Sequence, residues 1–472
     1  MNSCRFFVAP VRMLMQLALL GCLAACSLPL GLGQQSPSKT PSKTTPSGPC
    51  VVLALPSSGH YAAISGKIGK GARMALTEMA LNGTKMRLET VDTDASDWLQ
   101  KLDALPEECV VVGGPLQGRT FAQVRSTASV DKRAFFAFVP SLEHNDEGSL
   151  AWRFFPSPRD QVEALVNFAT DGLNIRSYGA FYPDDAYGTR MTALLEQNLS
   201  ARNMILQKAS YNPADKTSWS SAVAPLINPQ MPEGSRTPVP QTSFEAIFLP
   251  DSWKNLQMLI SSLLYNGEDR LVLLGTTLWE QGLSGKSVPQ AEKYALAVFP
   301  GAWNPDQAPK ALRVPGTDFW VALGYDFARF GVSMALRSRP DSRHVTVAAQ
   351  RASRMLWGMA PISWDDSGVA HQKLFVFGIT SSGMSPASAT DLQQTRERVM
   401  QQAALRMQGL PPEDETGHEL AVPPEESGSV PQSVPTPQEQ LLPMPQSPTP
   451  APTPVIGTTP RPSYKLRLPN AQ

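Results

Sequence analysis

Short apolar runs alternate with amphipathic stretches along the central part of the chain. Residues 51–55 and 110–113 are unbroken apolar runs, which is typical of strands that are buried on both faces of a parallel sheet. In residues 64–79 the apolar positions recur three and four apart, which predicts an amphipathic helix. Further strands are expected at 86–91, 134–139, 177–182, 246–249, 271–274 and 374–379. This alternation predicts an α/β fold with helices on both faces of parallel sheets.

The first 25 residues have the pattern of an export signal. Arg5 and Arg12 precede an apolar core at 13–20, which is too short to span a bilayer. Leu23-Ala24-Ala25-Cys26 then resembles the lipobox of bacterial lipoproteins, which implies cleavage before Cys26 and a lipid on its sulfur. The alternative is an ordinary signal peptide with an incidental cysteine. Ser27 implies, by the sorting pattern of many Gram-negative bacteria, a lipid-anchored protein of the outer membrane that faces the periplasm.

The two ends of the chain lack the composition of a folded domain. Residues 26–49 are rich in Ser, Thr and Pro, so we expect a lipidated flexible tether. Residues 383–472 are expected to be helical at first and then a disordered, proline-rich tail, which also holds many of the chain's 44 prolines. The tail is a spacer or, since residues 463–468 alternate like a strand, a segment that reaches a partner.

Several short motifs resemble those of a known superfamily. Leu53-Ala54-Leu55-Pro56-Ser57-Ser58-Gly59 and the later 182–188 resemble the openings of the two lobes of type I periplasmic binding proteins. Residues 112–116, 154–161 and 188–190 are similar to its branch of penicillin-binding-protein activator lipoproteins. The resemblance covers about 51–380 and implies two Rossmann-like lobes, joined by three crossing segments, with any ligand between them. It implies a domain at 50–382, with lobe 1 at about 50–156 and 299–357 and lobe 2 at about 157–298 and 358–382.

Two of the five cysteines are expected to pair. Cys4 and Cys22 leave with the signal peptide and Cys26 takes lipid, so Cys50 and Cys109 remain in an oxidising compartment. Each stands just before a strand-like run, and strands one and three are neighbours in the 2-1-3-4 order of a Rossmann-like lobe. Both cysteines then lie at one edge of the sheet, within reach of a disulfide. The alternative is two buried free thiols.

Residues that follow strand ends are the candidates for a ligand site. Helix N-termini at this edge offer free N–H groups to a carboxylate or phosphate. The plainer alternative is that the serines and aspartates among them only cap their helices. Amino-acid-binding members of the superfamily usually carry several small hydroxyl residues after the fourth strand, where only Ser141 fits here. The candidates are Ser57, Ser58, Tyr61, Gly114, Pro115, Ser141, Asp184, Asp185, Tyr187, Asp251, Ser252, Thr276 and Thr277.

The sequence offers no catalytic or metal-binding pattern. None of the five histidines has metal-ligand or triad spacing, and no Gly-x-Ser-x-Gly motif is present. Residues 66–71 lack the Gly-Lys-Ser/Thr ending of a phosphate loop. With 41 basic and 41 acidic residues the chain has no basic field for nucleic acid. We expect neither an enzyme nor a cofactor.

Two functions of different classes fit these observations. The nearest branch implies a lipoprotein that regulates peptidoglycan synthesis by contact with a protein partner, a peptidoglycan synthase. The alternative is the solute receptor of an ABC-type importer, which would bind a small polar ligand such as an amino acid and contact the importer permease. A closed polar pocket between the lobes would favour the receptor. A filled cleft with an apolar patch elsewhere would favour the regulator.

Overall fold

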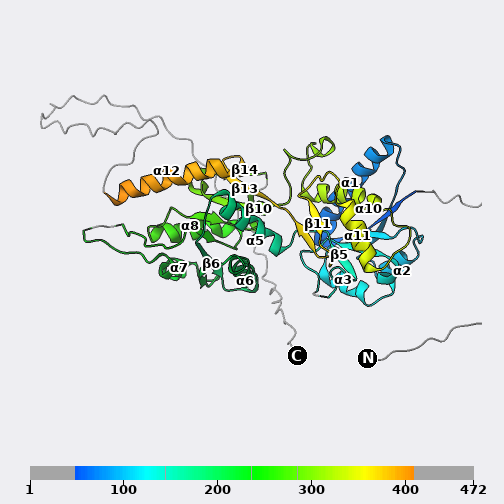
Figure 1. Ribbon diagram of the computed structural model, residues 1–472, viewed down its shortest axis with the longest axis horizontal. Coiled ribbons are helices and arrows are strands. Elements are labelled where there is room, and N and C mark those ends of the chain that lie inside the picture. Colours follow the sequence, from blue (N-terminus) through cyan, green and yellow to red (C-terminus); the bar gives the residue numbers. More distant parts are fainter. Residues whose placement is uncertain (1–47, 144, 235–236, 284, 409–472) are drawn as a thin grey trace, which may run out of the picture. The chain divides into compact units, whose positions relative to one another are not determined.

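The computed structural model describes residues 48–143, 145–234, 237–283 and 285–408. The expected signal peptide, the lipid site Cys26 and nearly all of the tether lie outside these residues, as does the tail beyond residue 408. The described chain contains two large β-sheets with their helices, and a third sheet of two strands (Figure 1). In that part of the chain no helix is both long and apolar enough to cross a membrane.

The sheet of lobe 1 has five parallel strands in the order β2-β1-β3-β4-β5. This confirms the expected 2-1-3-4 order and adds a short fifth strand. The unbroken apolar runs at β1, β3 and β4 are buried throughout, as a sheet covered on both faces requires. The strands are β1 (Cys50–Leu55), β2 (Arg87–Asp92), β3 (Val111–Gly113), β4 (Ala134–Ala137) and β5 (Ala151–Arg153).

Helices α1 (Ala62–Leu81) and α10 (Phe319–Ser333) pack together at very short range on lobe 1. A Cβ atom on Gly71 would lie 1.8 Å from the carbonyl oxygen of Val321, and one on Gly324 would lie 1.9 Å from that of Ile68. Only glycine therefore allows the two backbones to approach this closely. The lobe's other helices are α2 (Trp98–Asp103), α3 (Gly118–Arg125), α4 (Ser129–Lys132) and α11 (Ser342–Ala352).

The sheet of lobe 2 is mixed, with the order β14-β13-β10-β9-β8-β6-β7. Five strands are parallel, whereas β13 and β14 run antiparallel to their neighbours. The run expected at 374–379 is therefore an antiparallel addition to the sheet. The strands are β6 (Tyr178–Pro183), β7 (Leu206–Tyr211), β8 (Ala246–Phe248), β9 (Val272–Leu274), β10 (Ala297–Gly301), β13 (Phe375–Thr380) and β14 (Gly383–Pro386).

Helices of lobe 2 cover this sheet, and α12 is among them (Figure 1). Leu392 of α12 belongs to the same buried cluster as Val298 and Leu165. The first part of the expected tail is thus a strand and a helix of the lobe. The helices are α5 (Pro158–Asn167), α6 (Ala186–Ser200), α7 (Trp219–Ile227), α8 (Trp253–Tyr265), α9 (Leu278–Leu283) and α12 (Ala389–Met407).

The chain passes between the lobes three times, after β5, after β10 and after β12. β10 pairs entirely within the second sheet, whereas the hairpin of β11 (Ile362–Trp364) and β12 (Ala370–Gln372) packs on the core of lobe 1. We therefore propose lobe 1 at about 50–155 and 303–372, and lobe 2 at about 156–302 and 373–408. In this proposal the two boundaries lie C-terminal to those expected at 298/299 and 357/358, because it follows strand pairing and core packing.

A buried ion pair lies in the first crossing, and its hydrogen bonds reach the third. Arg153 and Asp160 are 4% and 2% exposed, and their Nη1 and Oδ2 atoms lie 2.9 Å apart. Asp160 also accepts hydrogen bonds from the backbone N–H and hydroxyl of Ser157 and from the backbone N–H of Gln372. Arg153 donates to the carbonyl oxygen of Ala370 as well. The first and third crossings are thereby held by one polar network, which we call the hinge network.

Cys50 and Cys109 form a disulfide, with a Cα–Cα distance of 4.6 Å. This confirms the expected pairing. Cys50 is the first residue of β1, and Val51 pairs with Val111 of the parallel neighbour β3. The bond therefore ties the amino ends of two adjacent strands in the centre of the sheet.

Candidate functional site

Ser57 and Ser58 follow β1 and contact the end of β2. The backbone N–H of Ser57 donates to Asp92, and so does its hydroxyl. The backbone N–H and hydroxyl of Ser58 donate to Asp94 at 2.9 and 2.7 Å. Ser58 makes no side-chain bond to its own helix, so the expected capping role is absent. The hydrogen bonds that Asp92 accepts lower its pKa, and the hydroxyl of Ser57 is the main cause.

The other lobe 1 candidates differ in exposure. Gly114 and Pro115 are buried. The backbone N–H of Gly114 donates to the carbonyl oxygen of Phe136 in β4 at 2.9 Å, and the N–H of Phe138, just after β4, donates to the carbonyl oxygen of Pro115 at 3.1 Å. Ser141 is exposed. Tyr61 is half-buried, with its ring edge-on to His60 at 5.2 Å. The first two therefore shape the sheet edge, and only exposed or half-buried groups are left to meet a ligand.

In lobe 2, Asp184 and Asp185 lie side by side in sequence but differ in role. The side chain of Asp185 accepts the backbone N–H of Gly188 at 2.7 Å and so caps α6, which is the plainer alternative expected above. The backbone N–H of Asp184 bonds to the carbonyl oxygen of Tyr211, and its side chain is exposed.

Asp251 is the centre of a polar cluster at the ends of β7 and β8. Its carboxylate accepts the hydroxyl of Tyr211 at 2.5 Å, the side-chain amide of Asn255 at 3.0 Å and the backbone N–H of Ser252 at 2.5 Å. Burial raises the pKa of Tyr211, and the negative charge of Asp251 adds to the effect. Sequence reasoning selected Asp251 and Ser252 but missed Tyr211, since nothing in the sequence pairs residues 40 positions apart.

The remaining lobe 2 candidates, Tyr187, Thr276 and Thr277, form hydrogen bonds within the protein. Burial raises the pKa of Tyr187, and its hydrogen bond with Thr276 partly offsets this. Thr277 donates its N–H and hydroxyl to Oε1 of Gln161 at 3.1 and 3.2 Å. Most of the polar candidates at the two sheet edges are thus already hydrogen-bonded to other side chains of the protein.

Glu280 is a functional candidate that sequence reasoning missed. It lies on α9, and a Cβ on Gly301 at the end of β10 would be 3.3 Å from its Oε2 atom. Burial raises its pKa from 4.5 to about 7, and the negative charge of Asp318 at the start of α10 adds to this. A cationic group bound beside Glu280, near the second crossing, would stabilise the charged form that burial disfavours.

The raised pKa of Glu280 predicts a pH-dependent stability. Below its unfolded value of 4.5 the carboxyl is protonated in both states and carries no penalty. As the pH rises from 4.5 to about 7, folding must keep a buried negative charge, and the protein loses about 3 kcal/mol of stability. Glu280→Gln should therefore be more stable than wild type by up to this amount at pH 8 and equally stable near pH 4.

Urea unfolding at pH 4, 6 and 8 measures the difference between the two proteins at each pH. Glu107→Gln is the matched control, because Glu107 is exposed and should show the same small effect at each pH. A Glu280→Gln effect that does not change with pH would contradict the argument.

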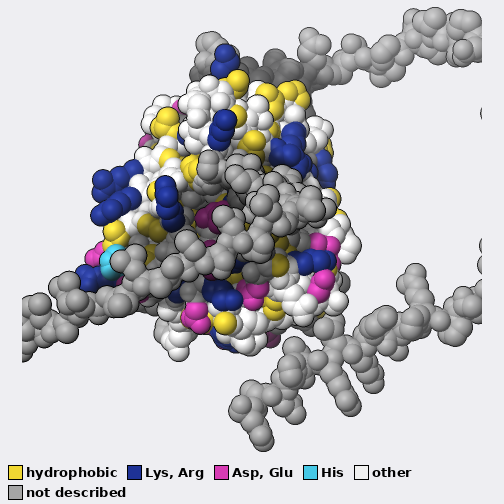
Figure 2. Space-filling model, turned by 90° about the vertical axis from the view of Figure 1, so that its right-hand side faces the viewer, with side chains coloured by type: hydrophobic (Ala, Val, Ile, Leu, Met, Phe, Trp, Pro, Cys, Tyr) yellow, Lys and Arg dark blue, Asp and Glu magenta, His cyan; other side chains and the backbone are white. Residues whose placement is uncertain are grey.

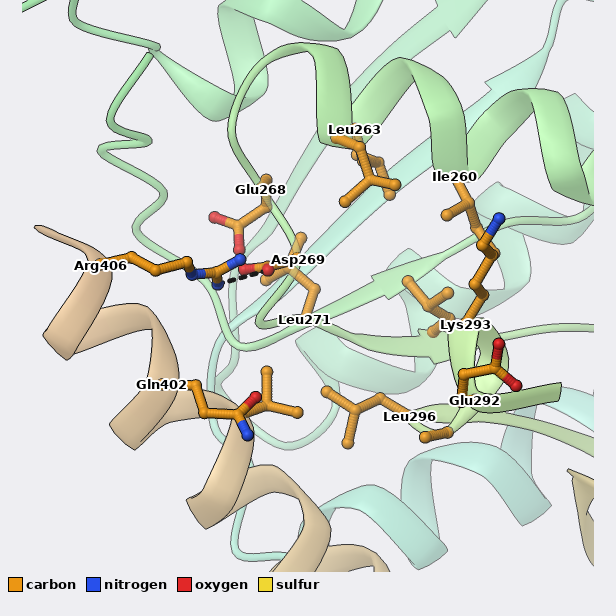
Figure 3. A pocket seen from close by; sticks show the side chains of 14 residues that line it. Ile260, Leu263, Glu268, Asp269, Leu271, Glu292, Lys293, Leu296, Gln402 and Arg406 are labelled. Carbon is orange, nitrogen blue, oxygen red and sulfur yellow. Dashed lines mark hydrogen bonds and ion pairs between the residues drawn. The ribbon is translucent and has the colours of Figure 1, made fainter. Parts of the chain in front are cut away.

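An apolar groove lies on lobe 2, away from the candidates above. Its walls come from α8, α12 and the loops that lead into β9 and β10, and it encloses about 240 Å³. Figure 3 shows Leu263, Ile260, Leu271 and Leu296 around its middle, with Arg406 of α12 bonded to Asp269 at the rim. Leu271 and Leu296 precede their strands, so this α8–α12 groove lies at the amino ends of the parallel strands.

Large apolar side chains are exposed on the two helices that form the α8–α12 groove. Leu264 and Tyr265 of α8 are 47% and 75% exposed, and Met407 of α12 is 51% exposed. Exposed apolar side chains that gather beside an apolar groove mark surfaces that bind other molecules. Sequence reasoning missed the groove because it assigned α12 to the tail.

The face drawn in Figure 2 carries both basic and acidic side chains, with hydrophobic groups between them. Within the described residues no three His, Cys, Asp or Glu side chains gather as they would around a metal ion. The α8–α12 groove and four other hollows of the described chain are not lined by any residue predicted for the ligand site.

Comparison with solved structures shows the fold. A putative branched-chain amino acid ABC transporter from Rhodospirillum rubrum matches 72% of this chain over 100% of its own, with 13% identity and a TM-score of 0.53. The C-domain of LpoA from Haemophilus influenzae, described as a regulator of PBP1A, matches 72% of this chain over 99% of its own, with 14% identity and a TM-score of 0.52. Full-length LpoA from that organism is similar at 13% identity and a TM-score of 0.51, and this chain spans 59% of its length.

No protein-family model and no curated protein sequence matches the chain. The structural likenesses confirm the type I periplasmic-binding-protein fold that the sequence motifs implied. The structures named are described as a regulator and as a putative ABC transporter, and these descriptions correspond to the two classes of function that the sequence left open.

Proposed function

We propose that this protein is a lipid-anchored regulator of peptidoglycan synthesis that binds a penicillin-binding synthase through the α8–α12 groove. The observation that carries the proposal is the apolar groove, which is lined by the 47% exposed Leu264. Apolar pockets at the centre of an interface are where protein complexes concentrate their binding energy. The likeness to the LpoA C-domain, a regulator of PBP1A, supports this class of partner.

The hydrogen bonding of the sheet edges supports a regulator over a receptor. Ser57, Ser58 and Asp251 are engaged by neighbouring side chains rather than left free for a ligand. A small polar ligand would have to replace these bonds with others of equal strength. A regulator that acts through its outer surface does not need free polar groups at the sheet edges. Its proposed role does not require catalysis either.

The lipobox at 23–26 supports the anchor in the same proposal. Acyl chains on Cys26 hold a protein at a membrane with about 0.8 kcal/mol per buried methylene group. Residues 26–49 would then give the domain reach from the outer membrane into the periplasm. A flexible tether would let the anchored domain contact a synthase that lies away from the outer membrane.

Site-specific photo-crosslinking in the host tests the partner. A photoreactive amino acid in place of Leu264 should give an adduct that a fluorescent penicillin labels, because Leu264 borders the groove. Leu264→Asp should weaken binding to the purified synthase about tenfold or more, since a charge enters an apolar contact.

Leu356 is the matched control, since it is 80% exposed but lies on lobe 1. The probe at this position should give no labelled adduct. The Cys26→Ser chain controls for the anchor: it should stay uncleaved, incorporate no palmitate and give no adduct from position 264. A penicillin-labelled adduct of equal strength from Leu356, or none from Leu264, would reject the proposal.

Glu280 favours a second candidate, the solute receptor of an ABC-type importer. Its buried carboxyl near the second crossing would pair with the cationic group of a small polar ligand such as an amino acid. Likeness to the Rhodospirillum rubrum transporter component supports this class. Native mass spectrometry of the protein from its host decides: an amino acid retained by the wild type and lost in Glu280→Gln would favour the receptor.

A further inference from the structure

Two adjoining hollows lie over α5, on the lobe 2 side of the third crossing. One lies between α5 and α6 and encloses about 370 Å³, and the other lies between α5 and the segment from β12 into β13 and encloses about 480 Å³. Glu163 of α5 and His371 of β12 line both hollows. We call the pair the α5 hollow, and its size suits a small molecule or a short peptide.

Basic groups outnumber acidic ones in the α5 hollow. Arg159, Arg202 and Lys373 line it, against Glu163 and Asp160, and the ring of His371 lies 3.4 Å from the carboxylate of Asp365. The carboxylate of Asp160 is neutralised by Arg153 and fully hydrogen-bonded in the hinge network. Among the described residues, Arg159, Lys373 and Glu163 have no ion-pair partner.

Two amide groups that line the hollow contain acceptors without a donor. Gln372 is 4% exposed, and its side-chain nitrogen donates to the carbonyl oxygen of Ala360 at 2.7 Å. Its Oε1 atom is buried and has no hydrogen-bond partner in the described chain. The Oδ1 atom of Asn198, on α6, is also buried and has no hydrogen-bond partner in the described chain. Buried acceptors of this kind cost about 1 to 3 kcal/mol each unless a donor satisfies them, so a ligand that brings N–H groups would be favoured.

Apolar side chains complete the larger hollow. Ala164 and Phe168 line it from the α5 side, and Leu374 and Val376 line it from the start of β13. A ligand that fits must therefore present a negative charge, N–H donors and small apolar groups within a few ångströms of one another. A short peptide with a free carboxylate has all three.

We propose that the α5 hollow binds a short peptide through its free C-terminal carboxylate. The carboxylate would pair with Lys373 in the larger hollow, and the peptide N–H and amino groups would donate to Gln372 and Glu163, which line the same hollow. Small side chains would rest against Phe168 and Leu374. This inference goes beyond the proposed function and stands without it, because none of these residues belongs to the α8–α12 groove or contacts Glu280.

Histidine NMR of the full chain in detergent tests the proposal. The protein has five histidines, so ¹³C-labelled histidine gives few ring signals, and His371→Gln identifies that of His371. Tri-L-alanine should shift the His371 signal with a dissociation constant of about 1 mM or lower and leave His60, on lobe 1, unchanged. Tri-L-alanine amide, which lacks the carboxylate, should bind at least about tenfold more weakly.

Lys373→Gln should also weaken tri-L-alanine binding about tenfold, because an exposed lysine can be replaced without disturbing the fold. Lys132→Gln, an exposed lysine of lobe 1, is the matched control and should bind like wild type. Equal shifts from the acid and the amide, no shift at about 10 mM, or an equal shift from inorganic phosphate would each overturn the proposal.

Discussion

Replacing Arg153 by methionine should lower the free energy of unfolding by about 3 to 5 kcal/mol, because it leaves the buried charge of Asp160 without its partner. The loss is large since both side chains are almost fully buried, so water cannot replace the guanidinium. The same change removes the donor to the carbonyl oxygen of Ala370. Equilibrium unfolding in urea, followed by tryptophan fluorescence, measures it.

Lys208→Met is the control for this experiment. Lys208 and Glu196 form an ion pair at the surface, where they are 42% and 44% exposed, and its loss should cost less than about 1 kcal/mol. The double variant Arg153→Met/Asp160→Asn should recover part of the stability, because it removes the unpaired charge. If Arg153→Met stays within about 1 kcal/mol of wild type, the hinge network does not hold the crossings as described.

Removal of the disulfide should have a comparable effect. The bond closes a loop with a sequence separation of 59, for which the chain-entropy model gives about 4 kcal/mol as an upper estimate. Cys50→Ala/Cys109→Ala should therefore unfold at markedly lower urea concentration than wild type. Wild-type protein whose disulfide has been reduced should also unfold at a lower urea concentration.

Peptide mapping without reductant is the direct check on the disulfide. One linked peptide pair that contains Cys50 and Cys109 is expected from the mature protein. Two separately alkylated peptides would contradict the bond, and equal stability of wild type and the double alanine variant would contradict its energetic role.

Sequence patterns predicted the strands that are buried on both faces. The runs at 51–55 and 246–249 correspond to β1 and β8, whose residues are all buried. The patterns failed for β7, an edge strand with exposed Gln207 and Lys208, and for β10, which contains Pro300. An edge strand need not be apolar on both faces, and proline weakens the signal of a strand. The lobe boundaries that we propose differ from the expected ones for the same reason, because the sequence patterns did not indicate β10 or the β11–β12 hairpin.

The candidate site could be predicted only in part. Residues that follow strand ends are predictable, because parallel strands end at one edge of a sheet. Their partners are not: the bond from Ser58 to Asp94 and that from Tyr211 to Asp251 depend on how turns place side chains from distant segments. The α8–α12 groove needs three segments that lie apart in the sequence, so no local pattern indicates it.

The position of the disulfide has a mechanical consequence. If the protein is anchored at its N-terminus, every pull on the tether reaches the domain at residue 50. There the load divides between β1 and, through the sulfur atoms, β3, so both central strands would have to slide together before the sheet could shear. Without the bond, the backbone hydrogen bonds of β1 alone would resist the force. A single-molecule pulling experiment from residue 49 should find a higher rupture force for the oxidised protein than for the reduced one.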